Sequence, residues 1–188
     1  MGKSIILLSG GLDSLVALGA YKEKYNISLA LTFDYGQKSA NEEIRTSKNI
    51  CKHYNIEHSI IKLDWLKKIT KTALVSNIEV PRDSFGTIDS AKRVWVPNRN
   101  ALFLNIAASF ADAQDFDYII FGANKDEAGN FPDNTELFQK NITELFKSST
   151  LKHPEVLAPL INYSKGDIVK IAIANDVPLH MVRSCYNS

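Results

Sequence analysis

A glycine pair between two serines follows the first apolar segment of the chain, in the order Ser9-Gly-Gly-Leu-Asp-Ser14. Glycine lets the backbone turn sharply with its amides exposed, and the helix expected after the turn directs its positive end at the same place. The serine hydroxyls add further donors. This combination predicts a phosphate-binding turn. The alternative is an ordinary strand-to-helix turn with Asp13 or Ser9 as the helix N-cap.

Two better-known phosphate-binding patterns are absent from the sequence. It contains no Gly-x-x-x-x-Gly-Lys-Ser/Thr loop, which would indicate cleavage between the β and γ phosphates, and no Gly-x-Gly-x-x-Gly turn for a dinucleotide. The serine-flanked turn therefore indicates a different class of nucleotide-binding protein.

Further candidate residues follow a later strand and precede a later helix. Asp34, Tyr35 and Gln37 lie just past the second expected strand, where ligands of open parallel sheets gather, although Asp-Tyr-Gly also favours a turn. Arg99 lies between two asparagines at the start of an apolar helix. A cation is unfavourable at that helix end unless an anion joins it, which favours a phosphate or carboxylate contact over a purely structural ion pair.

Composition sets the broad class. The 188 residues include 22 basic and 21 acidic side chains, and this balance gives no electrostatic case for a nucleic-acid or membrane partner. Small molecules are the expected ligands. The two cysteines, Cys51 and Cys185, show no pairing pattern, and no secretory or membrane-spanning segment is evident, so we expect a cytoplasmic protein with reduced thiols. The histidines show no metal-binding spacing, and Cys51 is expected in the core.

Short apolar runs alternate with helical patterns, which predicts a three-layer α/β domain over residues 1–188 with a mainly parallel sheet. Residues 75–95 are irregular and exceed the usual loop length, so a mobile flap or substrate loop is expected there. The expected strands are 4–8, 27–33, 57–63 and 117–122, and the expected helices are 13–25, 40–54, 101–114, 134–147 and 165–175.

Further motifs in fixed order accompany the turn: Thr32-Phe-Asp-Tyr-Gly-Gln37, Trp95-Val-Pro-Asn-Arg-Asn100, Gly122-Ala-Asn with Phe131-Pro-Asp133, and Leu157-Ala-Pro-Leu-Ile-Asn-Tyr-Ser-Lys165 with Ser184-Cys-Tyr186. Over nearly the whole chain the sequence resembles the 7-cyano-7-deazaguanine synthases, a family of PP-loop ATP pyrophosphatases. The resemblance implies an adenine nucleotide alpha hydrolase-like fold and a ligase that forms C–N bonds. Such an enzyme converts 7-carboxy-7-deazaguanine and ammonia into the nitrile preQ0 for queuosine biosynthesis, using ATP and magnesium.

The resemblance also implies roles for individual residues. It implies that the nucleotide is bound by Leu8, Ser9, Gly10, Gly11, Leu12, Asp13, Ser14, Asp34, Tyr35 and Gln37. It implies that Asp13, Ser14 and Arg99 are catalytic. It also implies that the substrate is bound by Arg99, Asn100, Asn124, Glu127 and Asp133.

Asp13, Glu127 and Asp133 have alternative roles, and so does Lys165. Asp13 either binds magnesium or caps the loop locally. Glu127 and Asp133 either accept hydrogen bonds from a guanine-like base or belong to a solvated acidic loop. Lys165 could pair with a phosphate, but Ser164 and Asp167 have the spacing of a helix capping box, and we favour that interpretation.

The last residues raise a separate question, because the family normally continues with further cysteines that bind a structural zinc. The sequence ends at Ser188, so Cys185 is the one zinc ligand present, and one cysteine cannot close a tetrahedral site. We expect a fragment or a natural truncation that holds no zinc by itself, with residues 181–188 frayed. A homodimer is expected from the resemblance alone.

Two other functions stay open. The first is a catalytically impaired nucleotide-binding remnant or subunit of the same fold. The second is a PP-loop enzyme that adenylates tRNA, which would need a basic surface or an RNA-binding appendage.

Overall fold

The computed structural model describes residues 2–70, 72, 74–75 and 94–183. A five-stranded sheet has the order β3-β2-β1-β4-β5, and every neighbouring pair is parallel. The strands are β1 (Ser4–Leu7), β2 (Ile27–Asp34), β3 (Glu57–Lys62), β4 (Tyr118–Ile120) and β5 (Glu155–Leu157). The helices are α1 (Leu12–Tyr25), α2 (Ala40–Tyr54), α3 (Leu66–Ile69), α5 (Arg99–Gln114), α6 (Lys125–Ala128), α7 (Glu136–Ser149) and α8 (Lys165–Ala174), with 3-10 turns η1 (Pro132–Asn134) and η2 (Leu179–Met181).

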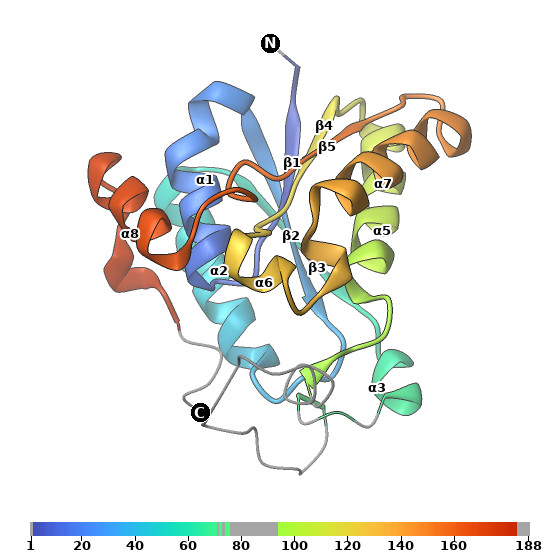
Figure 1. Cartoon of the computed structure of the whole chain (residues 1–188), viewed down its shortest axis with the longest axis horizontal. Helices are drawn as coiled ribbons and strands as arrows, with labels where there is room; N and C mark the ends of the chain where they lie inside the picture. Colours follow the sequence, from blue (N-terminus) through green and yellow to red (C-terminus); the bar gives the residue numbers. More distant parts are fainter. Residues whose placement is uncertain (1, 71, 73, 76–93, 184–188) are drawn as a thin grey trace.

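The sheet is the middle of three layers (Figure 1). Strand β1 lies at its centre and three of its four residues are buried, which explains why its sequence is an apolar run rather than an alternating one. Successive side chains point to opposite faces, so Ile5 packs in a cluster with residues of α5 and α7, while Ile6 packs in a second cluster with residues of α1, α2 and α8. The predicted three-layer, parallel α/β fold is therefore confirmed.

Most of the expected elements are present within one or two residues, and α2 has the expected bounds. Helix α5 begins at Arg99 rather than at residue 101, because Asn98 adopts a left-handed N-cap conformation and the Arg99 amide donates to the Val96 carbonyl. The helix expected over 134–147 is α7 at Glu136–Ser149, two residues later, because Thr135 caps α7 by accepting a hydrogen bond from the Phe138 amide.

Strand β5 was not expected from the sequence. It is only three residues long, lies between Pro154 and Pro159, and begins with an exposed glutamate, so it carries too little periodicity to be recognised. It nevertheless completes the sheet by pairing with β4. The expected flap falls mainly on residues 76–93, which lie outside the described residues.

The expectation that fraying begins at residue 181 is wrong for 181–183. Met181 ends η2, and the Arg183 amide donates to the Gly10 carbonyl at 3.1 Å. Residues 184–188 lie outside the described part of the chain.

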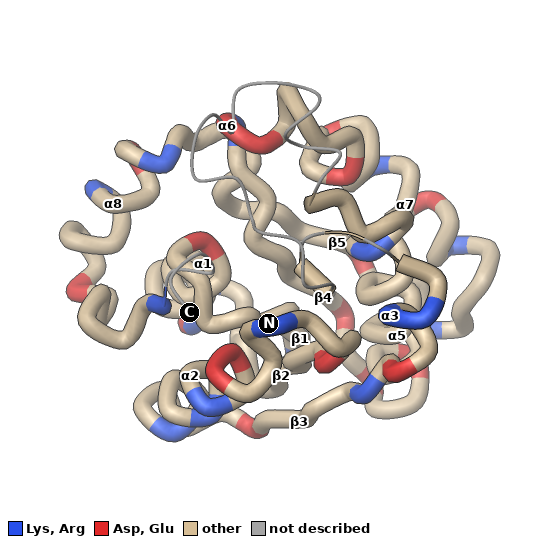
Figure 2. The backbone as a smooth tube through the Cα atoms, turned by 90° about the horizontal axis from the view of Figure 1, so that it is seen from below, with Lys and Arg blue, Asp and Glu red and all other residues tan. Residues whose placement is uncertain are grey.

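The distribution of charge and the composition of the helices are two further features of the described chain. Basic and acidic positions are interspersed along the described backbone, for example on α2, α7 and α8 (Figure 2). Among the helices of the described residues, none is both long enough and apolar enough to cross a membrane.

Phe146 provides a test of the packing. This α7 residue is fully buried against the sheet, so Phe146→Ala should lower the free energy of unfolding by about 3–5 kcal/mol. Leu151→Ala is the control, because Leu151 is 92% exposed and its loss should change stability by less than about 0.5 kcal/mol. Urea unfolding of both variants measures the difference, and equal losses would contradict the described core.

Candidate functional site

The turn between β1 and α1 is held by its two serines. The Ser14 hydroxyl donates to the Gly11 carbonyl at 3.1 Å, and the Ser9 amide donates to the Ser14 hydroxyl at 3.3 Å. The N-cap of α1 is Gly11, which has no side chain to cap the helix, so the alternative in which Asp13 or Ser9 caps it is wrong. The positive end of α1 therefore faces the turn, as an anion site requires.

Two glycines allow the turn to pack closely against its neighbours. Gly10 has a φ of +76°, and a Cβ atom there would lie 2.7 Å from Cγ2 of Thr46 on α2. A Cβ on Gly122, just after β4, would lie 3.0 Å from the Ser14 amide nitrogen. The start of α1 is thus enclosed by α2 on one side and by the end of β4 on the other.

Asp13 lies in a cluster of charged and polar side chains. The Lys165 ammonium donates to Asp13 Oδ2 at 2.5 Å and to Glu127 Oε1 at 3.0 Å, and the Asn124 amide donates to Asp13 Oδ2 at 3.4 Å. Asp13 Oδ1 is buried with no hydrogen-bond partner in the described residues. Burial raises the pKa of Asp13 more than the contact with Lys165 lowers it. Burial alone would lower the pKa of Lys165, but Glu127 and Asp13 together raise it, so the lysine is charged.

The predicted capping box is confirmed, but it does not account for Lys165. Ser164 accepts a hydrogen bond from the Asp167 amide, and the Asp167 carboxylate accepts one from the Ser164 amide. This box starts α8 at Lys165, and the lysine side chain then reaches back to Asp13. The capping-box interpretation therefore holds, and Lys165 in addition forms ion pairs with Asp13 and Glu127, which the sequence did not predict.

Asn124 is fully buried and caps α6 by accepting a hydrogen bond from the Glu127 amide at 3.1 Å. Its amide nitrogen faces Asp13. Both ends of the Asn124 side chain are thus used inside the protein, and it positions Glu127 and Asp13 relative to each other.

The residues after β2 form a compact turn. Gln37 accepts a hydrogen bond from the Tyr35 amide and donates to the Phe33 carbonyl and to Glu43 Oε2, each at 2.9 Å. Asp34 accepts one from the backbone amide two residues further on, at 3.1 Å. These bonds support turn formation as the role of Asp34 and Gln37 and fix the place of Tyr35.

Arg99 lies at the first position of α5 and donates to the Tyr35 hydroxyl at 3.1 Å. Burial opposes the charge of Arg99, but Tyr35, Asp133 and Glu43 outweigh it and raise the pKa of the guanidinium. Asp133 is buried, which raises the pKa of its carboxyl although Arg99 opposes the rise. The Asn100 amide donates to the Asp133 carbonyl at 3.4 Å, so the start of α5 and η1 are joined.

Of the two cysteines, Cys51 lies in the described part of the chain. Cys51 is buried on α2, as expected, and burial raises the pKa of its thiol to about 12. Cys185 lies outside the described residues. Within 2–70, 72, 74–75 and 94–183, no group of three or more His, Cys, Asp or Glu side chains could hold a metal ion.

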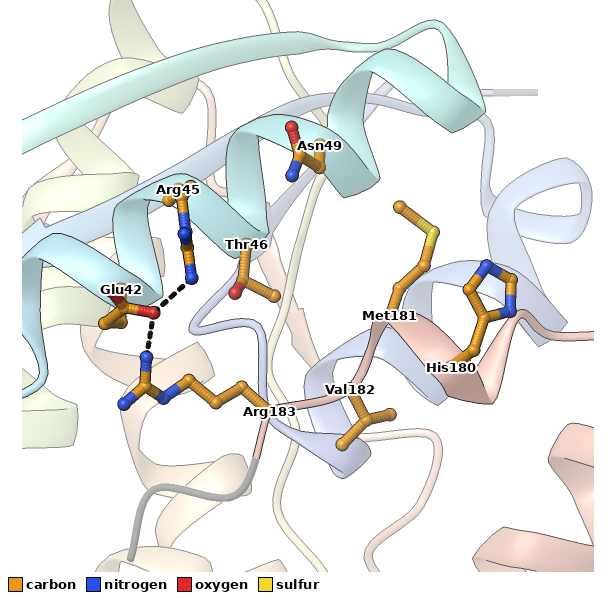
Figure 3. A pocket seen from close by; sticks show the side chains of 8 residues that line it. All are labelled: Glu42, Arg45, Thr46, Asn49, His180, Met181, Val182 and Arg183. Carbon is orange, nitrogen blue, oxygen red and sulfur yellow. Dashed lines mark hydrogen bonds and ion pairs between the residues drawn. The ribbon is translucent and has the colours of Figure 1, made fainter. Parts of the chain in front are cut away.

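An open pocket of about 710 Å³ lies behind the turn, between α2 and residues 180–183 (Figure 3). Arg45 and Arg183 both contact Glu42 Oε2 there, while the Arg183 backbone amide bonds to Gly10. Arg183 was missed by sequence reasoning, although it immediately precedes the Ser-Cys-Tyr motif. It links the last described residues to the turn.

The strand order, the glycine turn at the end of β1 and the surrounding charged groups define the chain as an α/β protein of the nucleotide-binding class. Solved structures share the fold. An NH3-dependent NAD synthetase from Campylobacter jejuni matches with a TM-score of 0.56 and 17% identity, over 96% of this chain and 66% of that one. A 4-thiouridine synthetase, solved as an RNA complex with bound ATP, matches with a TM-score of 0.58 and 22% identity, over 97% of this chain and 43% of that one.

Sequence comparison gives the family. The model described as "Queuosine biosynthesis protein QueC" matches residues 3–188, and the chain belongs to this family. A 7-cyano-7-deazaguanine synthase of Methanosarcina barkeri is 46% identical, over 98% of this chain and 84% of the relative. A 7-cyano-7-deazaguanine synthase of Carboxydothermus hydrogenoformans is 42% identical, over 99% of this chain and 89% of the relative.

The turn can be tested at Gly10. Gly10→Ala places a Cβ against Thr46 at a positive φ, so it should cost about 1–3 kcal/mol of stability and weaken ATP binding. The matched control is Gly129→Ala, because Gly129 has a φ of −70° and open space around its Cβ position. Thermal unfolding and calorimetric titration with ATP measure both effects. If the two variants bound ATP equally well, Gly10 would not shape the nucleotide site.

Proposed function

We propose that the chain is a 7-cyano-7-deazaguanine synthase, which uses ATP to convert 7-carboxy-7-deazaguanine and ammonia into the nitrile. The observation that carries this proposal is identity of 39–47% with synthases of this name, over 97–99% of the chain. The geometry of the glycine turn is compatible with it, since an anion can approach the start of α1.

The chemistry requires the same activation twice. A carboxylate oxygen attacks the α-phosphorus of ATP and pyrophosphate leaves, which gives an acyl adenylate. Ammonia attacks the acyl carbon, AMP leaves with its bonding electrons, and loss of a proton gives the amide. The amide oxygen then attacks the α-phosphorus of a second ATP and pyrophosphate leaves. Departure of AMP with its bonding electrons and loss of the two amide protons gives the nitrile. Positioning and charge neutralisation should supply most of the rate, because the phosphates must be held in line with the incoming oxygen.

The residues of the turn would bind the phosphates. The backbone amides of Gly10 and Gly11 and the hydroxyls of Ser9 and Ser14 are its donors, and the positive end of α1 faces the same point. The Ser14 hydroxyl donates to the Gly11 carbonyl and the Gly11 amide to the Ser9 hydroxyl, and a phosphate would replace these acceptors. Arg99 would meet the carboxylate or the α-phosphate, since its raised pKa keeps it charged beside Tyr35. Glu127 and Asp133 would accept hydrogen bonds from the polar edge of the deazaguanine ring.

A magnesium ion is compatible with Asp13. Its Oδ1 is a buried carboxylate oxygen with no hydrogen-bond partner among the described residues, and such an oxygen is a suitable hard ligand. When bound, the ion would neutralise charge on the phosphates. Lys165 and Asn124 hold the other oxygen of the same carboxylate and so fix its orientation.

The two alternative functions receive less support. Adenylation of tRNA would favour a basic surface, whereas basic and acidic positions are mixed along the described chain (Figure 2). A remnant without activity would not require the charged contacts around Asp13 and Arg99. The cytoplasmic location stays a prediction from the cysteine usage and segment pattern, and the homodimer and the absence of zinc from this chain stay predictions that depend on the resemblance.

The reaction products test the proposal directly. With ATP, magnesium, ammonia and 7-carboxy-7-deazaguanine, the protein should release AMP and pyrophosphate and form the nitrile, because the turn lacks the lysine of loops that cleave between the β and γ phosphates. Chromatography of the nucleotides and mass spectrometry of the deazaguanines measure both. If ADP were the nucleotide product, cleavage would fall between the β and γ phosphates and the proposal would be wrong.

Arg99 tests the anion contact. Arg99→Ala should lower turnover about a hundredfold or more, the scale of a lost charge-assisted contact, while the thermal midpoint changes little. Tyr35→Phe is the control, since it removes the hydroxyl that accepts from Arg99 and keeps the positive charge. A large loss of stability in Arg99→Ala, with activity per folded molecule preserved, would support a structural ion pair instead.

A further inference from the structure

Two aromatic rings, one from the segment that carries Arg99 and one from the segment that carries Asp133, stack on each other in nearly parallel planes. The ring centroids of Trp95 and Phe131 are 5.8 Å apart, and their planes differ by only 9°. Trp95 precedes Arg99 by four positions, and Phe131 precedes Asp133 by two. Both rings are half-buried, and neither belongs to the two hydrophobic clusters of the described chain.

The backbone that carries each ring is held by its neighbours. Val94 and Val96 are buried, with 7% and 2% of their surface exposed, so the half-buried Trp95 between them takes the side away from the core. The Phe131 amide donates to the Glu127 carbonyl at 2.9 Å, and the Phe131 carbonyl accepts from the Asn134 amide at 3.1 Å. The two rings therefore come from different segments of the chain, and both remain half-buried.

Charged groups lie next to this pair. The hydrogen bond from Asn100 to the Asp133 carbonyl joins the two segments, and Asp133 and Arg99 affect each other's pKa. A flat apolar surface beside a carboxylate and a guanidinium suits a planar heteroaromatic ring, whose face can stack while its polar edge is hydrogen-bonded.

We propose that Trp95 and Phe131 form a stacking platform for the deazaguanine ring of the substrate, next to Asp133. The pair thereby selects a planar bicyclic base, a role that neither residue received from the sequence. This inference rests on the proposed function and names the side chains that hold the base. The other ring that could stack here is the adenine of ATP, and the experiment separates the two.

Tryptophan fluorescence gives a readout that does not depend on turnover. The chain has two tryptophans, and Trp65 lies at the N-cap of α3 with 47% of its surface exposed. In Trp65→Phe, Trp95 is the sole indole. Titration of this variant with 7-carboxy-7-deazaguanine should quench its emission. Adding Phe131→Leu should weaken binding about 5- to 150-fold, the range for loss of one base–aromatic stack, whereas Phe131→Tyr keeps the ring and should bind as tightly.

Steady-state kinetics give a second readout. In the otherwise unmodified chain, Phe131→Leu should raise KM for 7-carboxy-7-deazaguanine by a similar factor and leave KM for ATP unchanged. A ring that serves only to pack the two segments together would not separate the two KM values.

The outcomes are distinct. Quenching by the deazaguanine together with the split in KM supports the platform. If the unmodified protein makes the nitrile but Phe131→Leu keeps its KM values, or if ATP alone quenches Trp95, the platform is rejected and the proposed function stands. Quenching without nitrile synthesis keeps the platform and rejects the proposed reaction. If the deazaguanine causes no quenching and no nitrile forms, both the platform and the proposed function are rejected.

Discussion

Parallel pairing of β1 with β2 on one side and β4 on the other is the constraint on which the candidate site depends. Strands that run the same way end at the same edge of the sheet, so the segments that follow them must meet there. The contact distances reflect this convergence: Thr32 of β2 donates to the Leu8 carbonyl at 2.8 Å, and Gly122 after β4 abuts the Ser14 amide. The sheet itself thereby brings together residues that are far apart in the sequence.

Buried amide side chains then give this edge a fixed shape. Gln37 and Asn124 are 4% and 0% exposed, and each joins the segment after its strand to a neighbouring element. A buried amide left without partners would be costly, so each favours one arrangement of its turn over others. Gln37 connects the turn after β2 to α2 through Glu43, and Asn124 connects α6 to Asp13. These side chains position the groups that would meet the ligands.

The sequence allowed prediction of the elements with strong local signals. Helix α2 has a clear apolar stripe and ends at Asn55 in a left-handed conformation, and its bounds were predicted correctly. Strand β5 was missed because three residues between prolines carry little periodic information. In the site, the glycine turn and the capping box were recognisable, since both depend on residues close in sequence. The reach of Lys165 to Asp13 depends on the packing of α8 against α1, which no local pattern encodes.

The bond from the Arg183 amide to the Gly10 carbonyl has a consequence for the order in which the protein is made. The glycine turn leaves the ribosome long before its backbone partner, because Gly10 precedes Arg183 in the chain by 173 positions. Pairing of β1 with β4 is likewise delayed until residues 118–120 have emerged. A nascent chain therefore carries an unfinished turn until residue 183 has been synthesised, and only then can the backbone bond between Arg183 and Gly10 form.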